Sequence, residues 1–320
     1  MTLRALGNTG LQIPPLVFGG NVFGWTADEK TSFSLLDALL ERGLTAIDTA
    51  DVYSAWAPGN HGGESETIIG KWLAANPGAR DKITLFTKVG SDMGAPDKKG
   101  LGAQWIARAV EDSLRRLQTD HIDLYFSHWP DDSTPYEQTL AAYEKLLNAG
   151  KIRAIGASNL NAEQLRTSLA RADEHKLPRY QVLQPEYNLY DRSAFEGPLQ
   201  DLVIKENIGV VTYYSLASGF LSGKYRSEKD LSKSKRGAGI AKYLNPRGTA
   251  ILTALDNVSA RHNVTPAQVA LAWLIAAPGV TAPIASATST EQIDGFVAAL
   301  ELTLSAADIN ELTQAGNQKA

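Results

Sequence analysis

Short runs of apolar and β-branched residues alternate along the chain with longer segments of helical periodicity. Eight runs are predicted strands: Leu16–Gly19, Ala46–Thr49, Ile83–Lys88, Ile122–His128, Ile152–Ala157, Val182–Gln184, Val210–Tyr213 and Val280–Ile284. Helices are predicted near residues 29–42, 65–75, 103–117, 135–148, 161–175 and 193–206, and as a pair near 249–275. Such alternation predicts a parallel sheet with crossover helices. We therefore expect an α/β fold, a (β/α)8 TIM barrel, in a single domain over residues 1–320.

Helix starts are marked by capping sequences. Thr134 and Thr265 each precede a proline and, at the third position, an acid or an amide. This order predicts a capping box with proline in the first helical turn. Ser289 and Gln292 have the same spacing as a capping box and predict the start of a helix near the C-terminus.

Two segments interrupt the alternation of strands and helices. Residues 217–248 are rich in glycine and lysine and show no clear apolar period. A connection of this length is uncommon unless it has a function, so we expect a mobile loop that covers a cofactor at the mouth of the barrel. Residues 55–63 form a second glycine-containing loop, which directly follows Tyr53.

The composition indicates a large core and little net charge. Of the 320 residues, 43% are hydrophobic and 21% are charged, and the formal net charge is −4. Without a basic surplus, nucleic acid and anionic membrane surfaces are not expected as partners. The lack of cysteine excludes disulfides and thiolate catalysis. Because no signal-peptide pattern and no long apolar run are present, we expect a soluble cytoplasmic protein.

Four polar residues lie at or just beyond the ends of predicted strands: Asp48, Tyr53, Lys88 and His128. Barrel enzymes carry their active sites at the mouth where these strand ends meet. An ammonium group beside a phenol favours the phenolate and lowers the pKa of the tyrosine, while a carboxylate holds the lysine in place. A histidine nearby can orient a carbonyl. Each residue alone has an ordinary structural explanation, so the prediction of proton transfer to a carbonyl depends on their joint placement.

Five short motifs occur in order along the chain. They read Asp48-Thr49-Ala50-Asp51-Val52-Tyr53, Thr87-Lys88-Val89, Ser127-His128-Trp129-Pro130, Gly156-Ala157-Ser158-Asn159 and Gln184-Pro185-Glu186-Tyr187-Asn188. In this order they resemble the motif series of the aldo-keto reductases. The resemblance implies a (β/α)8 barrel that binds NADP(H) without a Rossmann domain, and the chain has no G-x-G-x-x-G motif after a strand. It also implies that Tyr53 is the proton donor, that Lys88 and Asp48 tune it, and that His128 orients the carbonyl.

The resemblance further implies a nicotinamide site. Ser158, Asn159 and Gln184 offer hydroxyl and amide groups to the carboxamide, and Tyr213 offers a ring face to the nicotinamide. Two alternatives stay open. Asn159 is equally explained as a helix cap, with Asn161 as a competing cap, and Tyr213 is equally explained as a core residue.

Two groups of residues are predicted to hold the cofactor phosphates. The first suits a pyrophosphate, although a solvated loop would need no ligand, and comprises Leu216, Ser218, Gly219 and Lys224. The second offers the N–H groups of a helix start and comprises Ser286, Thr288, Ser289 and Gln292. The chain reads Tyr213-Tyr214-Ser215-Leu216 where many members of the family read Tyr-Ser-Pro-Leu. Because the second group lacks the basic residue that usually selects the 2′-phosphate, we expect NADP(H) to be preferred weakly over NAD(H).

Three tryptophans are candidates for the substrate wall. Trp25, Trp56 and Trp129 each follow a predicted strand end, which favours an apolar or aromatic carbonyl compound, although contacts between helices and barrel explain them equally well. The other histidines, at positions 61, 121, 175 and 262, lack the spacing of metal ligands, so no metal site is predicted.

The leading hypothesis is an NADPH-dependent reductase of aldehydes and ketones that acts as a monomer or small homo-oligomer. One alternative is a Schiff-base aldolase with Lys88 as its nucleophile, which would leave Ser158, Asn159, Gln184 and Tyr213 unexplained. The other alternative is a cofactor-binding regulatory protein, because the resemblance extends to potassium-channel β-subunits.

Overall fold

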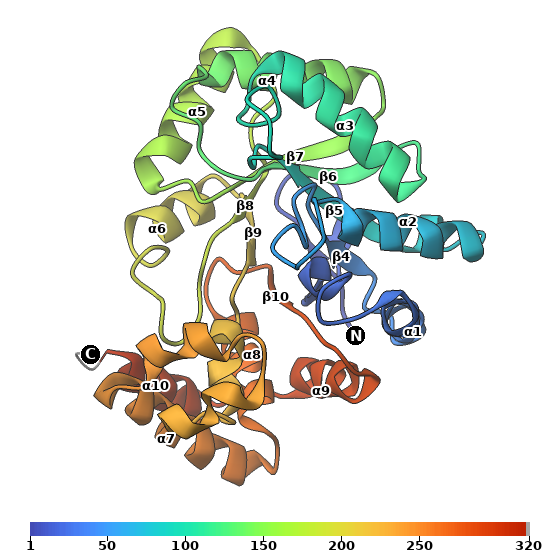
Figure 1. The fold of residues 1–320 in the computed structure, drawn as a ribbon. Coiled ribbons are helices and arrows are strands. Elements are labelled where there is room, and N and C mark those ends of the chain that lie inside the picture. The colour runs from blue at the N-terminus through green and yellow to red at the C-terminus, as the bar shows by residue number, and fades with distance from the viewer. Residues whose placement is uncertain (318–320) are drawn as a thin grey trace.

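The computed structural model describes residues 1–317, apart from the side chain of residue 238. Eight parallel strands form a closed barrel in the order β10-β3-β4-β5-β6-β7-β8-β9, which lies at the centre of Figure 1. The strands are β3 (Val17–Gly19), β4 (Ala46–Asp48), β5 (Thr84–Val89), β6 (Ile122–Ser127), β7 (Ile152–Ser158), β8 (Val182–Gln184), β9 (Gly209–Thr212) and β10 (Ala282–Ala285). The predicted (β/α)8 barrel is therefore confirmed.

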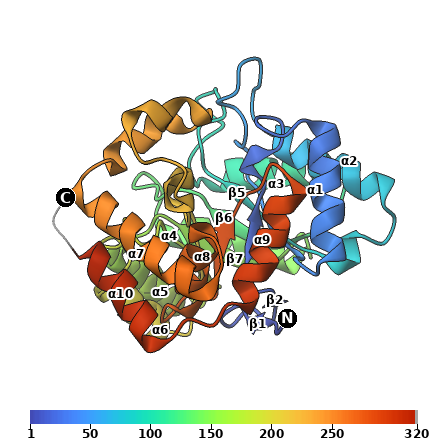
Figure 2. The same ribbon diagram turned by 90° about the horizontal axis from the view of Figure 1, so that it is seen from below.

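Helices cover the outside of the barrel, as Figure 2 shows. They are α1 (Glu29–Glu41), α2 (Glu64–Ala75), α3 (Ala103–Leu117), α4 (Tyr136–Asn148), α5 (Ala162–His175), α6 (Pro198–Lys205), α7 (Pro246–His262), α8 (Pro266–Ala276), α9 (Thr290–Glu301) and α10 (Ala306–Gly316). Helix α10 was not predicted from the sequence. Its start is a capping box between Ser305 and Asp308, a local signal that the strand-and-helix period does not register.

An N-terminal hairpin closes one end of the barrel. Strands β1 (Arg4–Ala5) and β2 (Gln12–Ile13) pair antiparallel, and Leu6 and Ile13 join the cluster of side chains that fills the barrel interior. Arg4 Nη1 donates to the backbone oxygens of Ile275 at 3.0 Å and Thr281 at 3.1 Å. This hairpin was not predicted, because strands of two residues are too short to show a period.

The segment 217–248 contains more secondary structure than the sequence predicted. It contains three 3-10 helices, η3 (Ala217–Ser222), η4 (Glu228–Lys233) and η5 (Gly237–Tyr243), and α7 begins within it at Pro246. Short 3-10 turns produce no apolar period, which explains why the sequence suggested a connection without elements.

Two of the predicted helix starts can be compared directly. The capping box of α8 is present, with the Thr265 side chain and Gln268 bonded reciprocally. The predicted box at Thr134 is wrong, since the cap of α4 is Pro135 and makes no side-chain bond. Thr134 Oγ1 instead donates to Asp131 Oδ2 at 2.8 Å, because the aspartate of the preceding turn competes for the hydroxyl.

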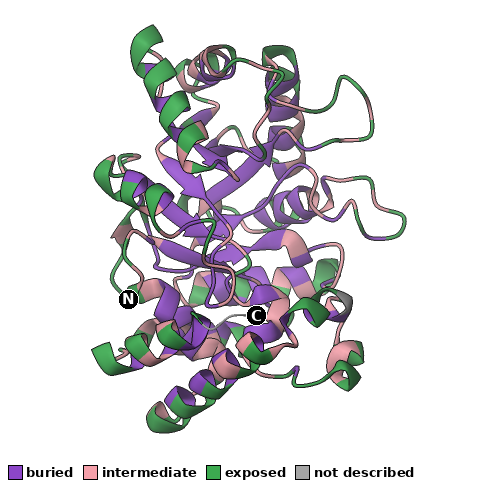
Figure 3. Cartoon of the chain, turned by 90° about the vertical axis from the view of Figure 1, so that its left-hand side faces the viewer, coloured by how far each residue is buried: buried purple, intermediate pink, exposed green. Residues whose placement is uncertain are grey.

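The core has two parts, inside and outside the barrel wall. Most residues of the barrel strands are buried, and the outward faces of the helices are exposed (Figure 3). Inside the barrel, the Phe126 ring fills the space opposite Gly156, where a Cβ would lie 2.5 Å from Phe126 Cε1. Glycine at position 156 therefore allows an aromatic ring to occupy the barrel axis.

Helix α2 packs directly against the backbone of α3 at Gly70. A Cβ at this position would clash with the backbone oxygen of Arg116 and would lie 2.8 Å from the carbonyl carbon of Leu117. A backbone atom cannot move aside as a side chain can, so any larger residue would force the two helices apart.

A buried carboxyl group lies behind the barrel wall. Asp51 is 1% exposed, and neither of its carboxyl oxygens has a hydrogen-bond partner among the described residues. Burial, followed by the charge of Glu66, raises the pKa of Asp51 well above its ordinary value. Glu66 differs, because it accepts from Arg116 Nε at 2.6 Å and from Thr87 Oγ1 at 2.5 Å.

Gly70→Ala should lower the free energy of unfolding by about 1–3 kcal/mol, because it overpacks the contact between α2 and α3. Gly295→Ala is the matched control. Gly295 lies inside α9, where the nearest atom to a Cβ would be Gln268 Nε2 at 3.8 Å, so the alanine should stabilise the protein by about 0.5–1 kcal/mol. Urea unfolding of both variants measures the effects, and equal shifts would contradict the assignment of the clash.

Asp51→Asn should remove one part of the pH dependence of stability. In the native protein the carboxyl keeps its proton at pH values where the unfolded chain, with a pKa of about 4, has lost it. The native state then binds more protons, so this group makes the free energy of unfolding fall as pH rises. Urea midpoints between about pH 4 and about pH 7 should therefore shift progressively in favour of the variant. A constant difference between the two proteins would contradict the raised pKa.

Candidate active site

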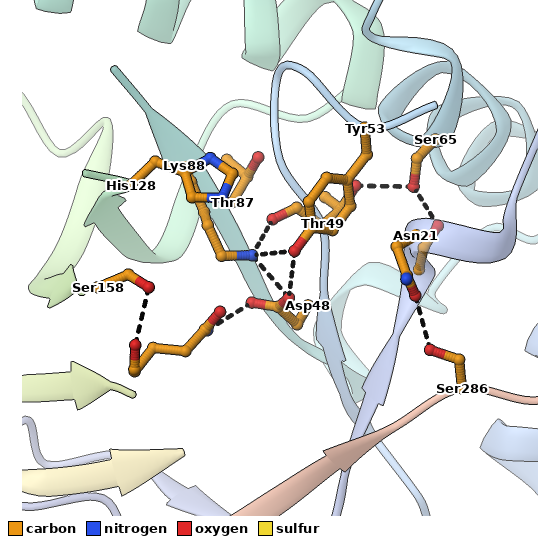
Figure 4. A network of polar contacts seen from close by, with 12 residues as sticks. Asn21, Asp48, Thr49, Tyr53, Ser65, Thr87, Lys88, His128, Ser158 and Ser286 are labelled. Carbon is orange, nitrogen blue, oxygen red and sulfur yellow. Dashed lines mark hydrogen bonds and ion pairs between the residues drawn. The ribbon is translucent and has the colours of Figure 1, made fainter. Parts of the chain in front are cut away.

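The side chains of Asp48, Tyr53 and Lys88 meet at the carboxyl ends of the strands. Lys88 Nζ donates to Asp48 Oδ2 at 2.6 Å, to the backbone oxygen of Thr49 at 2.8 Å and to the Tyr53 hydroxyl at 2.9 Å (Figure 4). The Lys88 side chain is fully buried. The structure therefore brings together three of the residues that the sequence placed at the mouth.

The loop after β4 places Tyr53 over this ion pair. It first continues beside β5, since Thr49 N donates to the backbone oxygen of Phe86 at 2.9 Å. It then turns at Ser54, whose φ of 76° is unusual for a residue with a side chain, and Ser54 Oγ donates to the backbone oxygen of Phe23 at 2.6 Å. This fixed turn holds the tyrosine in one position.

The Lys88 ammonium is saturated with hydrogen bonds. An ammonium group has three donors, and all three are used by the contacts described above. Burial lowers the pKa of Lys88, and the adjoining carboxylate of Asp48 opposes that effect. The amine has no free lone pair in this arrangement, which argues against its action as a nucleophile.

The pKa of Tyr53 differs from the expectation. Burial, followed by the charge of Asp48 3.4 Å away, raises the pKa of Tyr53 well above 10. The sequence predicted a lowered pKa for Tyr53 because it treated Asp48 only as the partner of Lys88, whereas the carboxylate also lies within reach of the tyrosine hydroxyl. The phenol is therefore firmly protonated at neutral pH and contacts a cation that would stabilise its conjugate base.

His128 follows β6 and completes a tetrad with Asp48, Tyr53 and Lys88. Its backbone N–H donates to the oxygen of Val89 at 2.8 Å, and its ring lies edge-on to Tyr53 with centroids 6.0 Å apart. Burial, with a smaller effect of Lys88, lowers the pKa of His128 well below its ordinary value. The imidazole is therefore neutral at physiological pH.

The predicted carboxamide residues form a connected network beside the tetrad. Ser158 Oγ donates to the backbone oxygen of Gln184 at 2.7 Å, and Gln184 Nε2 donates to Asp48 Oδ1 at 3.0 Å. The Tyr213 hydroxyl donates to Asn159 Oδ1 at 2.7 Å. Amide and hydroxyl groups thus converge next to the buried ion pair.

Asn159 is not a helix cap. Its Nδ2 donates to the backbone oxygen of His128 at 2.9 Å, and its φ of 63° is in the left-handed region, which asparagine tolerates better than most residues. The cap of α5 is Asn161, which forms a capping box with Gln164. Of the two alternatives left by the sequence, the structure selects Asn161 as the cap.

The first set of residues predicted to bind a phosphate lies on a sharply turned backbone. After Leu216, the φ angles are positive at Ala217, Ser218 and Gly219, with values of 47°, 58° and 101°. The N–H groups of Ala217 and Gly219 donate to the backbone oxygens of Tyr214 at 2.7 Å and Leu216 at 2.8 Å, so they are engaged within the turn. Lys224 Nζ lies beside this turn, where it would be 3.8 Å from a Cβ at Gly219.

The second set of residues predicted to bind a phosphate lies at the start of α9. Ser286 Oγ lies 2.7 Å from the side-chain amide of Asn21. Ser289 is the cap of α9 but makes no side-chain capping bond, and Gln292 Oε1 accepts from Thr288 N at 2.7 Å. The predicted capping box is therefore wrong, because the glutamine reaches one residue further back. The first N–H groups of α9 remain available to an anion.

These donors fit a nicotinamide dinucleotide. The amides and hydroxyl beside the tetrad match the donor and acceptor pattern of a carboxamide. Lys224 beside the turned backbone supplies a cation, and the start of α9 supplies N–H groups, which match phosphates. The residues present thus form two kinds of site that one extended cofactor would use together.

Aromatic side chains line the mouth. Trp56 lies edge-on to both Tyr53 and Trp25, with ring centroids 5.8 Å apart in each pair. Trp56 and Trp129 are each 49% exposed, which is high for so large an apolar residue. All three predicted tryptophans therefore lie near the tetrad, with Trp56 against Tyr53, Trp25 against Trp56, and Trp129 stacked on His128.

Sequence reasoning missed several residues of the mouth. Arg236 Cζ lies 5.2 Å from the Trp25 ring, and in the orientation that satisfies both of its polar atoms the Asn21 amide accepts from Arg236 Nη2 at 3.3 Å. Tyr214 is 49% exposed, and Ser91 Oγ lies 3.0 Å from His128 Nδ1. These contacts depend on how loops fold back over the barrel, so no local pattern marked them.

Two histidines outside the tetrad contact aspartates. His121 Nδ1 lies 2.6 Å from Asp120, and His262 Nε2 lies 2.9 Å from Asp308. Among residues 1–317, no three side chains of the histidine, aspartate or glutamate type gather as metal ligands would. In the same part of the chain, no helix has the length and apolar character needed to cross a bilayer.

Comparison with known proteins gives the same picture as the geometry. A family model described as the aldo/keto reductase family matches residues 15–317. An uncharacterized 11.2 kDa protein of Pseudescherichia vulneris is 84% identical over 95 residues, which are 30% of this chain and 92% of that protein. The aldo-keto reductase YhdN of Bacillus subtilis is 33% identical over 98% of this chain and 92% of its own length. A probable voltage-gated potassium channel subunit beta of Arabidopsis thaliana is 31% identical over 94% and 92%, respectively.

The match includes all eight strands of the barrel and the tetrad, and leaves out the N-terminal hairpin. The similarity to the family therefore extends over nearly the whole chain and is not limited to one motif. Members of this family are oxidoreductases that use nicotinamide cofactors on carbonyl compounds. The chain belongs to the aldo/keto reductase family.

Proposed function

We propose that the protein reduces aldehydes and ketones to alcohols with NADP(H), reversibly, and that Tyr53 provides the proton. The observation that carries this proposal is the position of the Tyr53 hydroxyl between Lys88 Nζ at 2.9 Å and Asp48 Oδ2 at 3.4 Å, beside a neutral His128. A protonated phenol with a cation already in contact is suited to give up its proton as negative charge develops on a carbonyl oxygen.

Lys88 supports the proton transfer without moving. When Tyr53 loses its proton, the phenolate forms 2.9 Å from an ammonium group that Asp48 and the Thr49 carbonyl hold in place. A fixed donor needs no reorganisation during the reaction and therefore lowers the barrier more than a mobile one. Asp48 keeps the lysine charged, and its bond to Gln184 links the ion pair to the cofactor site.

The chain's amides and hydroxyls would hold the cofactor against this cluster. Ser158, Asn159 and Gln184 would bind the carboxamide and Tyr213 would support the ring, while the phosphates would bind the segments described above, comprising Leu216, Ser218, Gly219, Lys224, Ser286, Thr288, Ser289 and Gln292. A bound reduced nicotinamide supplies a hydride to the carbonyl carbon. Trp25, Trp56 and Trp129 would surround an apolar or aromatic substrate and exclude water from it.

The segment 217–248 is proposed to act as a cover over the cofactor within one barrel domain of residues 1–320. Its backbone carries Lys224 next to the turned segment at Gly219, and Arg236 reaches Trp25 on the substrate side. A segment that contacts both the cofactor site and the substrate site can exclude water from the two sites together.

The alternatives receive less support from the geometry. A Schiff-base aldolase requires a free amine, whereas the three donors of Lys88 are engaged. A regulatory subunit of the channel type would bind a cofactor without needing a proton donor, so loss of turnover in a Tyr53 variant separates that role from the reductase.

Tyr53→Phe should reduce turnover of aldehydes by about 10²–10⁴-fold, because it removes the proton donor and little volume. NADPH oxidation measures turnover, and quenching of tryptophan fluorescence should show that the variant still binds NADPH. Tyr125→Phe is the matched control, since Tyr125 is buried in β6 and its hydroxyl has no partner among the described residues. Turnover above a tenth of the wild-type value in Tyr53→Phe would remove this residue from the role of acid.

Cofactor preference should be modest in the wild type and should increase in Ser289→Arg. Loss of one charged hydrogen bond is worth about 1.5–3 kcal/mol, so the ratio of kcat/KM for NADPH over NADH is expected below about 100. A guanidinium at the cap of α9 could grip a 2′-phosphate bidentately. Steady-state kinetics with both cofactors provide the test, with Ser289→Gln as the uncharged control. A wild-type ratio in the thousands would show that another cation selects the phosphate.

A further inference from the structure

One hydroxyl group contacts two aromatic rings of the mouth. Ser91 follows β5 by two residues and is 8% exposed. Its Oγ lies 3.0 Å from His128 Nδ1 and accepts from Trp129 Nε1 at 3.2 Å. The two rings are stacked, with centroids 5.5 Å apart and an interplanar angle of 13°. Ser91 therefore bonds to the edges of two rings that are stacked on each other.

Donor counting decides where the single proton of the Ser91 hydroxyl goes. The indole N–H of Trp129 is only a donor, so it occupies a lone pair of Ser91 Oγ. If His128 Nδ1 accepts, the serine proton is used, and Ser91 Oγ, His128 Nδ1 and Trp129 Nε1 all have partners. If Nδ1 carried a proton, both rings would donate to the serine, and its own proton would have no acceptor among the described residues. Burial makes that second arrangement unfavourable.

The other nitrogen of the ring is then free to act. With Nδ1 as the acceptor, a neutral imidazole carries its proton on Nε2. His128 Nε2 has no hydrogen-bond partner among residues 1–317, and its ring lies edge-on to Tyr53. The proton is thus on the nitrogen that no protein group uses.

We infer that Ser91 is a positioning residue, which together with Trp129 fixes His128 as the Nε2–H tautomer and so makes it a hydrogen-bond donor to the substrate carbonyl. The consequence for the substrate depends on the proposed function, whereas the tautomer does not. Trp129 thereby has a second role beside that of a substrate wall, since its N–H directs the serine proton toward the histidine.

The chemistry of the partner also matters. A carboxylate at Nδ1 would stabilise the imidazolium and create a second acid next to Tyr53. A hydroxyl that donates to Nδ1 stabilises the neutral ring instead, and the facing charged group is the Lys88 ammonium, which acts in the same direction. Ser91 thus keeps His128 a donor that orients the carbonyl and leaves Tyr53 as the acid.

Long-range ¹H–¹⁵N spectra of protein labelled at its histidine rings test the tautomer directly. His128→Gln assigns the signal among the five histidines. We expect the Nε2–H pattern in the wild type near pH 7.5 and in Ser91→Thr, which keeps the hydroxyl. Ser91→Ala should show a mixture with a substantial Nδ1–H fraction. Ser259→Ala is the matched control, because it removes a buried hydroxyl in α7 that has no partner among the described residues, and it should leave the signal unchanged.

The kinetic consequence is measured on the same variants. Ser91→Ala should lower kcat/KM for an aldehyde by roughly tenfold, as expected for the loss of one oriented hydrogen bond, and Ser91→Thr should restore most of it. An Nδ1–H pattern in the wild type, or an unchanged Nε2–H pattern in Ser91→Ala, would overturn the inference. The wild-type spectrum decides even if Ser91→Ala fails to fold. If the wild type reduced no carbonyl compound, the proposed function would fail while the tautomer could still be established.

Discussion

The rest of the site depends on a buried ion pair between Lys88 and Asp48. Removing both charges from water is costly, and the cost is offset only if every donor and acceptor has a partner. The Thr49 carbonyl, the Tyr53 hydroxyl and the Gln184 amide meet that requirement. The residues that would serve chemistry are thus also the residues that make a buried charge tolerable. Change in any one of them alters both the electrostatics and the folding of the mouth.

The barrel makes this arrangement rigid because its parts come from separate strands. Asp48 ends β4, Lys88 lies in β5 and Gln184 ends β8, so their side chains converge only when the sheet is closed. Loops add the residues that require unusual backbone angles, such as Ser54 and Asn159. This division between strand and loop is typical of barrel enzymes, in which a fixed frame carries adaptable connections.

The sequence predicted the barrel and the meeting of the tetrad, because strand period and strand-end position are local signals. It did not predict the hydrogen-bond partners of those residues. The raised pKa of Tyr53 follows from burial and from a carboxylate 3.4 Å away, and Ser91 becomes relevant only when β5 and β6 lie side by side. The capping box expected at Ser289 failed for a similar reason, since a competing acceptor one residue away is a matter of geometry and not of spacing. The sequence thus identifies the candidate residues, whereas their protonation states and hydrogen-bond partners follow only from the three-dimensional structure.

The N-terminal hairpin has a consequence for synthesis of the protein on the ribosome. Arg4 bonds to backbone oxygens more than 270 residues later, at Ile275 and Thr281, and β3 pairs with β10. The hairpin therefore leaves the ribosomal tunnel more than 270 residues before its partners, and it can seal the barrel only after they emerge. Contacts of such high sequence separation slow folding and leave β-strand edges exposed in the nascent chain. A circular permutant that joins the hairpin directly to the end of the chain would shorten this wait.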